Sequence, residues 1–239
     1  GSGTSFRARF MIDQGMMVAS MDMLKNAMIF CTGATAGAFL SWVGSRCSPG
    51  EPAVSKLYWS YPVIAVLSGV SYWLMFSEDR ELSEWFPGLV LLSVLTVLAV
   101  SDLKYRLLPD AVTVPAMAFF ALWHLLLPVL PFWHHVLGFF VGGGIPFLVS
   151  WIAARLNKPP MGGGDIKLLA MLGLALGAER VVLVLLAASA LGVAAAFFLM
   201  VTGKLERGQF VPFGPSIAAA AVLCWFFGQD WLQWYYDFF

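Results

Sequence analysis

The chain has 239 residues, of which 60% are hydrophobic and 12% are charged, and its formal net charge is zero. Soluble domains carry roughly 25% charged residues, so this composition excludes an ordinary soluble globular protein. The zero net charge says nothing about nucleic acid, and no basic arm or aromatic–basic stripe indicates such a partner. The composition predicts an all-α, polytopic protein of the lipid bilayer.

Apolar runs recur along the chain, separated by short polar or Pro/Gly-bearing stretches. They predict about eight transmembrane helices, at residues 26–44, 61–77, 85–101, 111–127, 135–155, 165–178, 180–202 and 215–230. We expect a single transmembrane domain over residues 26–239, preceded by a tail over residues 1–25 that opens with a vector-derived Gly-Ser-Gly-Thr-Ser remnant. Gly142-Gly143-Gly144 lies inside the fifth run and predicts close helix packing.

Positive charges predict which side of the membrane each loop occupies. If successive loops alternate sides, nine of the fourteen Lys and Arg residues fall on one side and five on the other. The nine are Arg46, Lys56, Lys104, Arg106, Arg155, Lys158, Lys167, Lys204 and Arg207. Cytoplasmic loops carry the excess of Lys and Arg, so the nine-charge side is expected to face the cytoplasm.

Two aspartates at the edges of apolar runs are the candidate functional residues. They are Asp102, in SDLKYRLLPD, and Asp165, in MGGGDIKLL, and both fall on the nine-charge side. A carboxylate beside hydrocarbon is costly, so each is a functional-site hypothesis. Two carboxyl groups that share a proton supply the base that activates water and the acid that protonates a leaving nitrogen. The pair therefore suits an aspartyl protease.

The glycines before Asp165 fit the same hypothesis. Gly162, Gly163 and Gly164 free the backbone to bend and let an extended substrate strand approach closely. Their backbone N–H groups could also stabilise a developing oxyanion.

These segments resemble the two signature regions of the type IV prepilin peptidases, which are membrane aspartyl proteases of the G-x-G-D type. In SDLKYRLLPDAVTVP, Asp102 is followed eight positions on by the aspartate of Pro109-Asp110. In MGGGDIKLLAMLGLALG, the glycines lead to Asp165 and then Lys167. Further on, Pro212-Phe213-Gly214-Pro215 is similar to a Pro-Phe-Gly-Pro stretch of that family.

The resemblance implies a specific reaction. The family removes a short basic leader from prepilins and pseudopilins, after a glycine and at the cytoplasmic face of the bacterial inner membrane, for type IV pili and type II secretion. It implies catalytic roles for Asp102 and Asp165, with Gly162, Gly163, Gly164 and Lys167 as substrate-binding or motif-supporting residues. Asp110 is the competing catalytic candidate, but it follows a proline and opens a helix, which makes it an ordinary helix-start residue.

Larger members of that family also methylate the new N-terminus with S-adenosylmethionine. They carry an insert after the first span with two Cys-x-x-Cys pairs of metal-binding type. Here the equivalent stretch, residues 45–60, is short and holds only Cys47, so no metal is expected. The sequence leaves four points open: methyl transfer, the pilin that is cleaved, the choice between pilus and secretion pathway, and the oligomeric state.

Other function classes are weighed beside this one. A proton- or cation-coupled transporter could use the same two aspartates, although carboxylates deep within spans would favour it more. A presenilin-type protease shares the Gly-x-Gly-Asp element but begins its first signature with Tyr-Asp, whereas this chain has Ser101-Asp102. A membrane scaffold is the third alternative. His124, His134 and His135 are expected at the membrane–water interface on the side away from the cytoplasm, not in a metal site.

Overall fold

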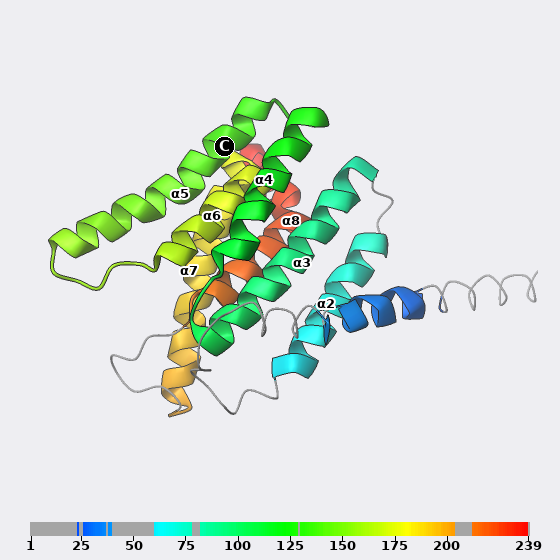
Figure 1. Ribbon diagram of the computed structural model, residues 1–239, viewed down its shortest axis with the longest axis horizontal. Helices are drawn as coiled ribbons and strands as arrows, with labels where there is room; N and C mark the ends of the chain where they lie inside the picture. Colours follow the sequence, from blue (N-terminus) through cyan, green and yellow to red (C-terminus); the bar gives the residue numbers. More distant parts are fainter. Residues whose placement is uncertain are drawn as a thin grey trace, which may run out of the picture.

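The computed structural model describes residue 23 and residues 26–36, 38–39, 60–77, 82–128, 130–203 and 212–238. Within these ranges all regular structure is helical, which confirms the predicted all-α class (Figure 1). The helices are α2 (Ser60–Ser77), α3 (Leu82–Tyr105), α4 (Asp110–Leu126), α5 (Phe132–Arg155), α6 (Gly163–Leu176), α7 (Ala178–Val201) and α8 (Gly214–Phe238). Residues 26–36 are also helical. Most of the predicted tail, and Cys47 with its surroundings, lie outside the described residues.

Three helices of the described chain are long and apolar enough to cross a membrane. They contain the segments Phe86–Tyr105 of α3, Phe132–Arg155 of α5 and Ala178–Val201 of α7. Large apolar side chains on α5 and α7 are exposed, as expected of surfaces that face lipid, among them Phe140, Phe147, Leu186, Val193 and Phe197. The predicted membrane character is supported, whereas the count of eight transmembrane helices remains a prediction.

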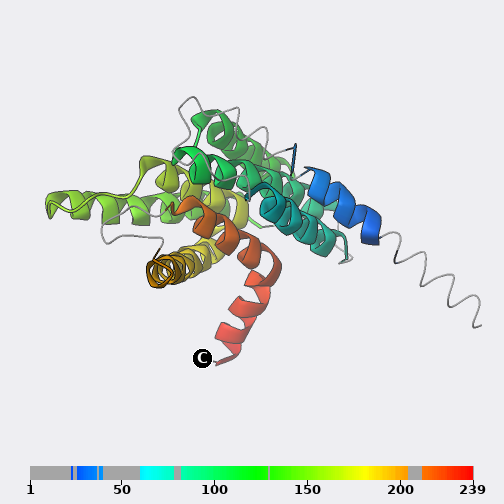
Figure 2. The same ribbon diagram turned by 90° about the horizontal axis from the view of Figure 1, so that it is seen from below.

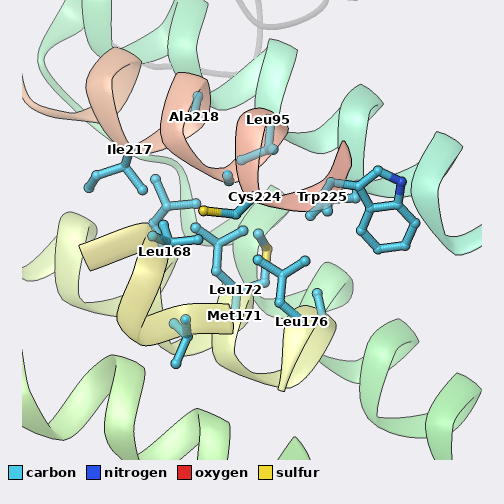
Figure 3. Close-up of a cluster of buried hydrophobic side chains, with 14 of the residues drawn as sticks. Leu95, Leu168, Met171, Leu172, Leu176, Ile217, Ala218, Cys224 and Trp225 are labelled. Atoms are coloured by element: carbon cyan, nitrogen blue, oxygen red, sulfur yellow. The ribbon is translucent and has the colours of Figure 1, made fainter. Parts of the chain in front are cut away.

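Helix α6 is the buried centre of the bundle. Its residues from Leu168 to Leu176 are all buried, because the helix is apolar on every face. Figure 3 shows Leu168, Met171, Leu172 and Leu176 facing side chains of α3 and α8. At 14 residues and about 1.5 Å per residue, α6 is about 21 Å long, shorter than the roughly 30 Å hydrocarbon core. Because α6 is packed between its neighbours over most of its length, its first turn is held in a fixed place at one end of the helix.

Glycines bring α5 and α6 into backbone contact. A Cβ atom added to Gly138 would meet the carbonyl group of Gly173, and one added to Gly142 would meet the carbonyl oxygen of Leu169. Such close approach is typical of small residues at membrane helix interfaces. Helix packing at Gly142 is thus as predicted, whereas a Cβ on Gly144 would have no neighbour within 4 Å.

Two of the histidines lie inside the bundle, at the end of α6 opposite Asp165. His124 of α4 and His135 of α5 are buried, and their rings stack with centroids 3.7 Å apart. His124 Nε2 lies 3.2 Å from the carbonyl oxygen of Ala175, and His135 Nδ1 lies 2.9 Å from that of Leu174. Because a carbonyl only accepts, both rings donate, and they satisfy carbonyl groups that the C-terminal end of α6 leaves unpaired. Both histidines thus bind a helix end within the bundle.

The C-terminal part of α8 leaves the bundle, as the view from below shows (Figure 2). Residues 229–231 and 233–238 are exposed there, including the aromatic side chains of Trp231, Trp234, Tyr235 and Tyr236. The N-terminal part of α8 packs in the core, where Ile217, Cys224 and Trp225 are buried (Figure 3). The first turn of α8 therefore lies within the bundle, beside α3.

Candidate active site

Asp102 lies in the last turn of α3. The predicted span ends at residue 101, but the helix continues to Tyr105. The Arg106 N–H donates to the carbonyl oxygen of Asp102 at 2.9 Å, and Arg106 has a positive φ of 52°, which is the left-handed conformation that ends many helices. Ser101 Oγ then donates to the carbonyl oxygen of Leu107 at 2.8 Å. This tight turn fixes the orientation of Asp102.

Asp165 lies in the first turn of α6, where the positive end of the helix dipole favours a carboxylate. The three glycines before it have different surroundings. A Cβ on Gly162 would lie 3.2 Å from Asp165 Oδ2, and one on Gly164 would lie 3.0 Å from Leu108 Cβ. A Cβ on Gly163 would have no neighbour within 4 Å. A side chain at the first or third position would thus crowd Asp165 or Leu108, whereas one at the second would not, in agreement with the G-x-G pattern.

A third segment completes the site. The backbone N–H of Gly214, at the start of α8, donates to Asp102 Oδ2 at 2.8 Å. A Cβ on Gly214 would lie 2.6 Å from that oxygen, so a larger residue would displace the carboxylate. In the sequence, Pro212-Phe213-Gly214-Pro215 carries a family resemblance but indicates no role for Gly214. That similarity was the only signal in the sequence that could have identified Gly214 as part of the site.

The two aspartates line one open cavity of about 330 Å³. Its other lining residues are Arg106, Met161, Gly162, Pro212 and Phe213. Asp102 is buried, with 6% of its surface exposed, while Asp165 is half-buried. Segments far apart in the sequence therefore meet at a cavity that is open at one side and bears two carboxyl groups.

Asp110 and Lys167 form an ion pair outside this cavity. Lys167 Nζ donates to both carboxylate oxygens of Asp110, at 2.8 and 2.7 Å, and both side chains are exposed. Asp110 is the first residue of α4, as predicted. The pair joins the start of α4 to the start of α6, and Lys167 does not line the cavity.

Burial disfavours the ionised form of Asp102, and two neighbouring groups partly offset this effect. The Gly214 N–H donates directly to its carboxylate, and the positive charge of Arg106 acts on the same group. Two carboxyl groups at one cavity repel each other when both are ionised, which favours protonation of one of them. In the part of the chain that the structure describes, no group of three His, Cys, Asp or Glu side chains could hold a metal ion.

Comparisons with known proteins show the family of the chain. A family model described as "Type IV leader peptidase family" matches residues 89–199, a range that includes both aspartates. A Bacillus subtilis (strain 168) protein named "Prepilin leader peptidase/N-methyltransferase" is 30% identical over 190 residues, which cover 80% of this chain and 74% of that protein. No solved structure matches the chain.

Proteins of the same name from other bacteria match over a similar range. The Aeromonas salmonicida (strain A449) protein is 30% identical over 195 residues, covering 81% of this chain and 66% of that protein. The Dickeya chrysanthemi protein is 33% identical over 195 residues, covering 77% of this chain and 65% of that protein. The chain thus spans slightly less than two thirds of the length of these two relatives. On this similarity, the chain belongs to the type IV leader peptidase family.

Proposed function

We propose that this chain is a membrane-embedded aspartyl endopeptidase that removes the leader of prepilins or pseudopilins, with Asp102 and Asp165 as its catalytic pair. One observation carries the proposal: the aspartates of two separate signature segments line the same cavity. Membership of the leader peptidase family supports it and disfavours the transporter alternative.

The surroundings of the two carboxyl groups give each a role. Asp102, which accepts the Gly214 N–H, is the ionised base, and Asp165 holds the shared proton. Asp102 takes a proton from water as the water oxygen attacks the scissile carbonyl carbon, and Asp165 gives its proton to the carbonyl oxygen. When the intermediate collapses, Asp102 protonates the leaving nitrogen, the C–N bond breaks, and Asp165 recovers its proton. Both groups return to their starting states.

An apolar groove beside the cavity suits the helix of such a substrate. The groove has a volume of about 420 Å³ and lies between α2, α3 and α8. It begins at Leu103 and Pro215, the residues next to Asp102 and Gly214, and is lined further on by Ala99, Ala218 and Ala219. On this proposal the scissile bond lies at the aspartates and the apolar helix that follows it enters the groove.

We further propose that residues 26–239 form one domain of about eight membrane-crossing segments in the bacterial inner membrane. The excess of Lys and Arg on the side of both aspartates supports a site that faces the cytoplasm. Gly162, Gly163 and Gly164 remain candidates for contact with the substrate strand, and of these Gly162 lines the cavity.

The names of the relatives also include N-methyltransferase, and S-adenosylmethionine would supply the methyl group. The groove does not suit this ligand, because its only polar side chains are the hydroxyl groups of Ser68, Ser71 and Thr96. Methyl transfer is therefore tested separately, by incubating cleaved pilin and enzyme with isotope-labelled S-adenosylmethionine. Label on the new N-terminus would establish the second activity.

The first test is cleavage of a prepilin by purified enzyme in liposomes. We expect Asp102→Asn and Asp165→Asn to abolish cleavage and Asp110→Asn to retain it, at equal amounts of folded protein. An inactive Asp110→Asn variant together with an active Asp102→Asn variant would move the catalytic role to Asp110. Normal cleavage by all three variants would reject the aspartyl mechanism.

A further inference from the structure

Arg106 has a backbone conformation that is unusual for an arginine. It has a φ of 52°, and its N–H donates to the carbonyl oxygen of Asp102 four residues earlier, so it occupies the left-handed position directly after α3. Glycine is the usual residue there, because a Cβ atom is disfavoured at positive φ. This chain nevertheless has a long cationic side chain at a place where glycine would be less strained.

The end of α5 offers a comparison within the same chain. Asn157 has a φ of 55° and lies two residues after α5, where the Lys158 N–H donates to the carbonyl oxygen of Ala153 at 2.9 Å. Asparagine is the residue that most often replaces glycine in this conformation. Among the described residues with positive φ, Arg106 and Asn157 are the two that are not glycine. Helix termination explains Asn157, but it does not explain an arginine.

The position of Arg106 at the cavity indicates a role as a hydrogen-bond donor. Arg106 lines it together with both aspartates, Met161, Gly162, Pro212 and Phe213. Of these side chains, Arg106 alone carries N–H donors, five of them in a planar fork. An extended peptide presents both N–H and C=O groups, and the carboxylates mainly accept hydrogen bonds. The protonated Asp165 faces the scissile carbonyl oxygen, and among the described lining side chains only Arg106 is left to donate to the other carbonyl oxygens of a bound strand.

We propose that Arg106 is a substrate-binding residue whose guanidinium group donates hydrogen bonds to main-chain carbonyl oxygens of the substrate strand beside the catalytic aspartates. This inference rests on the proposed peptidase function. It also accounts for the position of the residue: the left-handed turn directs the backbone away from the helix within four residues of Asp102, so the side chain can reach the same cavity.

The test compares Arg106→Gly, Arg106→Met and Asn157→Gly in the prepilin cleavage assay, with thermal unfolding measured on the same samples. Arg106→Gly removes the donor and relieves the backbone, whereas Arg106→Met removes the donor and keeps the strained backbone. We expect both Arg106 variants to lose about tenfold or more in kcat/KM, mainly through a higher KM, because a hydrogen bond from a charged donor is lost. We expect Arg106→Gly to unfold at or above the wild-type temperature.

The control and the rescue separate this role from a structural one. Asn157→Gly changes the same kind of backbone position outside the cavity and is expected to cleave at the wild-type rate. Added ethylguanidine is expected to restore part of the activity of Arg106→Gly but not of Asp165→Asn. Wild-type kcat/KM in Arg106→Met would overturn the inference and leave the aspartyl peptidase intact. An inactive wild-type enzyme would instead reject the proposed function.

Substrate variants test which oxygen atoms are bound. If Arg106 binds main-chain carbonyl groups, the loss of kcat/KM in Arg106→Met persists with a prepilin whose acidic residues near the cleavage site are replaced by their amides. If the loss disappears with that substrate, Arg106 binds an acidic side chain, and the main-chain assignment is wrong.

Discussion

Asp102 receives a hydrogen bond from a residue that has no room for a side chain. The Gly214 N–H lies 2.8 Å from Asp102 Oδ2, and an added Cβ would lie 2.6 Å from the same atom. We therefore expect Gly214→Ala to displace the carboxylate and to lower kcat/KM by on the order of 100-fold, because small displacements of catalytic groups have large effects. The measurement is prepilin cleavage at equal amounts of folded enzyme.

Gly144→Ala is the matched control for that substitution. A Cβ on Gly144 meets nothing within 4 Å, and this glycine lies inside α5. Alanine is favoured over glycine within a helix by about 0.5–1 kcal/mol, so this variant is expected to be slightly more stable and fully active. Equal activity of Gly144→Ala and Gly214→Ala would contradict the role given to the Gly214 N–H.

The glycines of the G-x-G-D motif are predicted to differ in their tolerance of a side chain. Gly163 has open space at its Cβ position, whereas a Cβ on Gly164 would lie 3.0 Å from Leu108 Cβ. We expect Gly163→Ala to keep near wild-type cleavage and Gly164→Ala to lose activity and thermal stability together, since the α3–α4 connection must move. If Gly163→Ala instead lost more activity and thermal stability than Gly164→Ala, the surroundings described for these two glycines would be wrong.

The sequence predicted the catalytic candidates better than it predicted their surroundings. Asp102 and Asp165 can each be recognised from the local sequence, because a carboxylate beside an apolar run is unusual. The Gly214 donor and the Lys167–Asp110 pair depend on contacts between distant segments, which no local pattern contains. The burial of His135 could not be predicted for the same reason, because its partner, the Leu174 carbonyl group, lies on another helix.

At the level of elements, apolar runs predicted which helices exist but located their ends less well. Helix α3 continues through Asp102 to Tyr105, because backbone hydrogen bonding continues after the apolar pattern stops. Helix α8 continues to Phe238, eight residues beyond its predicted end, since its last turns are amphipathic and not uniformly apolar. Helix α6 begins at Gly163, so two glycines that were expected to bend the chain belong to a helix.

The groove between α2, α3 and α8 leads to a prediction about substrate length. Ala219 lines the groove, so Ala219→Phe would fill part of it. We expect this variant to raise KM for a full prepilin about tenfold, because the apolar helix loses its contact area. Cleavage of a short peptide that ends soon after the scissile bond is expected to be unchanged.

Ala194→Phe controls for the added bulk, since Ala194 is exposed on α7 and does not line the groove. It is expected to leave KM for both substrates unchanged. A rise in KM for the short peptide with Ala219→Phe would mean that the substitution disturbs the aspartates themselves and that the groove has no separate role.

At the level of the whole molecule, the charge distribution predicts the orientation in the membrane. Asn157 and Leu130 are exposed and lie in the loops at the two ends of α5. In a variant without Cys31, Cys47 and Cys224, we expect a membrane-impermeant maleimide to label Leu130→Cys on intact spheroplasts. Asn157→Cys is expected to react only after the membrane is opened, because its loop belongs to the nine-charge side.

Labelling in the opposite sense would place the aspartates on the outer face and reject the proposed cytoplasmic site. Labelling of both cysteines on intact spheroplasts would mean that α5 does not cross the membrane. The cysteine-free parent serves as the blank, since Cys31 is exposed in the structure.

The late position of Gly214 in the chain has a consequence for synthesis. Asp102 and Asp165 are translated, and can enter the membrane, before residues 212–214 exist. Until then the cavity lacks Pro212 and Phe213, and Asp102 lacks the Gly214 donor. On the proposed function, a chain still attached to the ribosome carries both acids without proteolytic activity. Neighbouring proteins in the same membrane are therefore exposed to the active protease only once the start of α8 is in place.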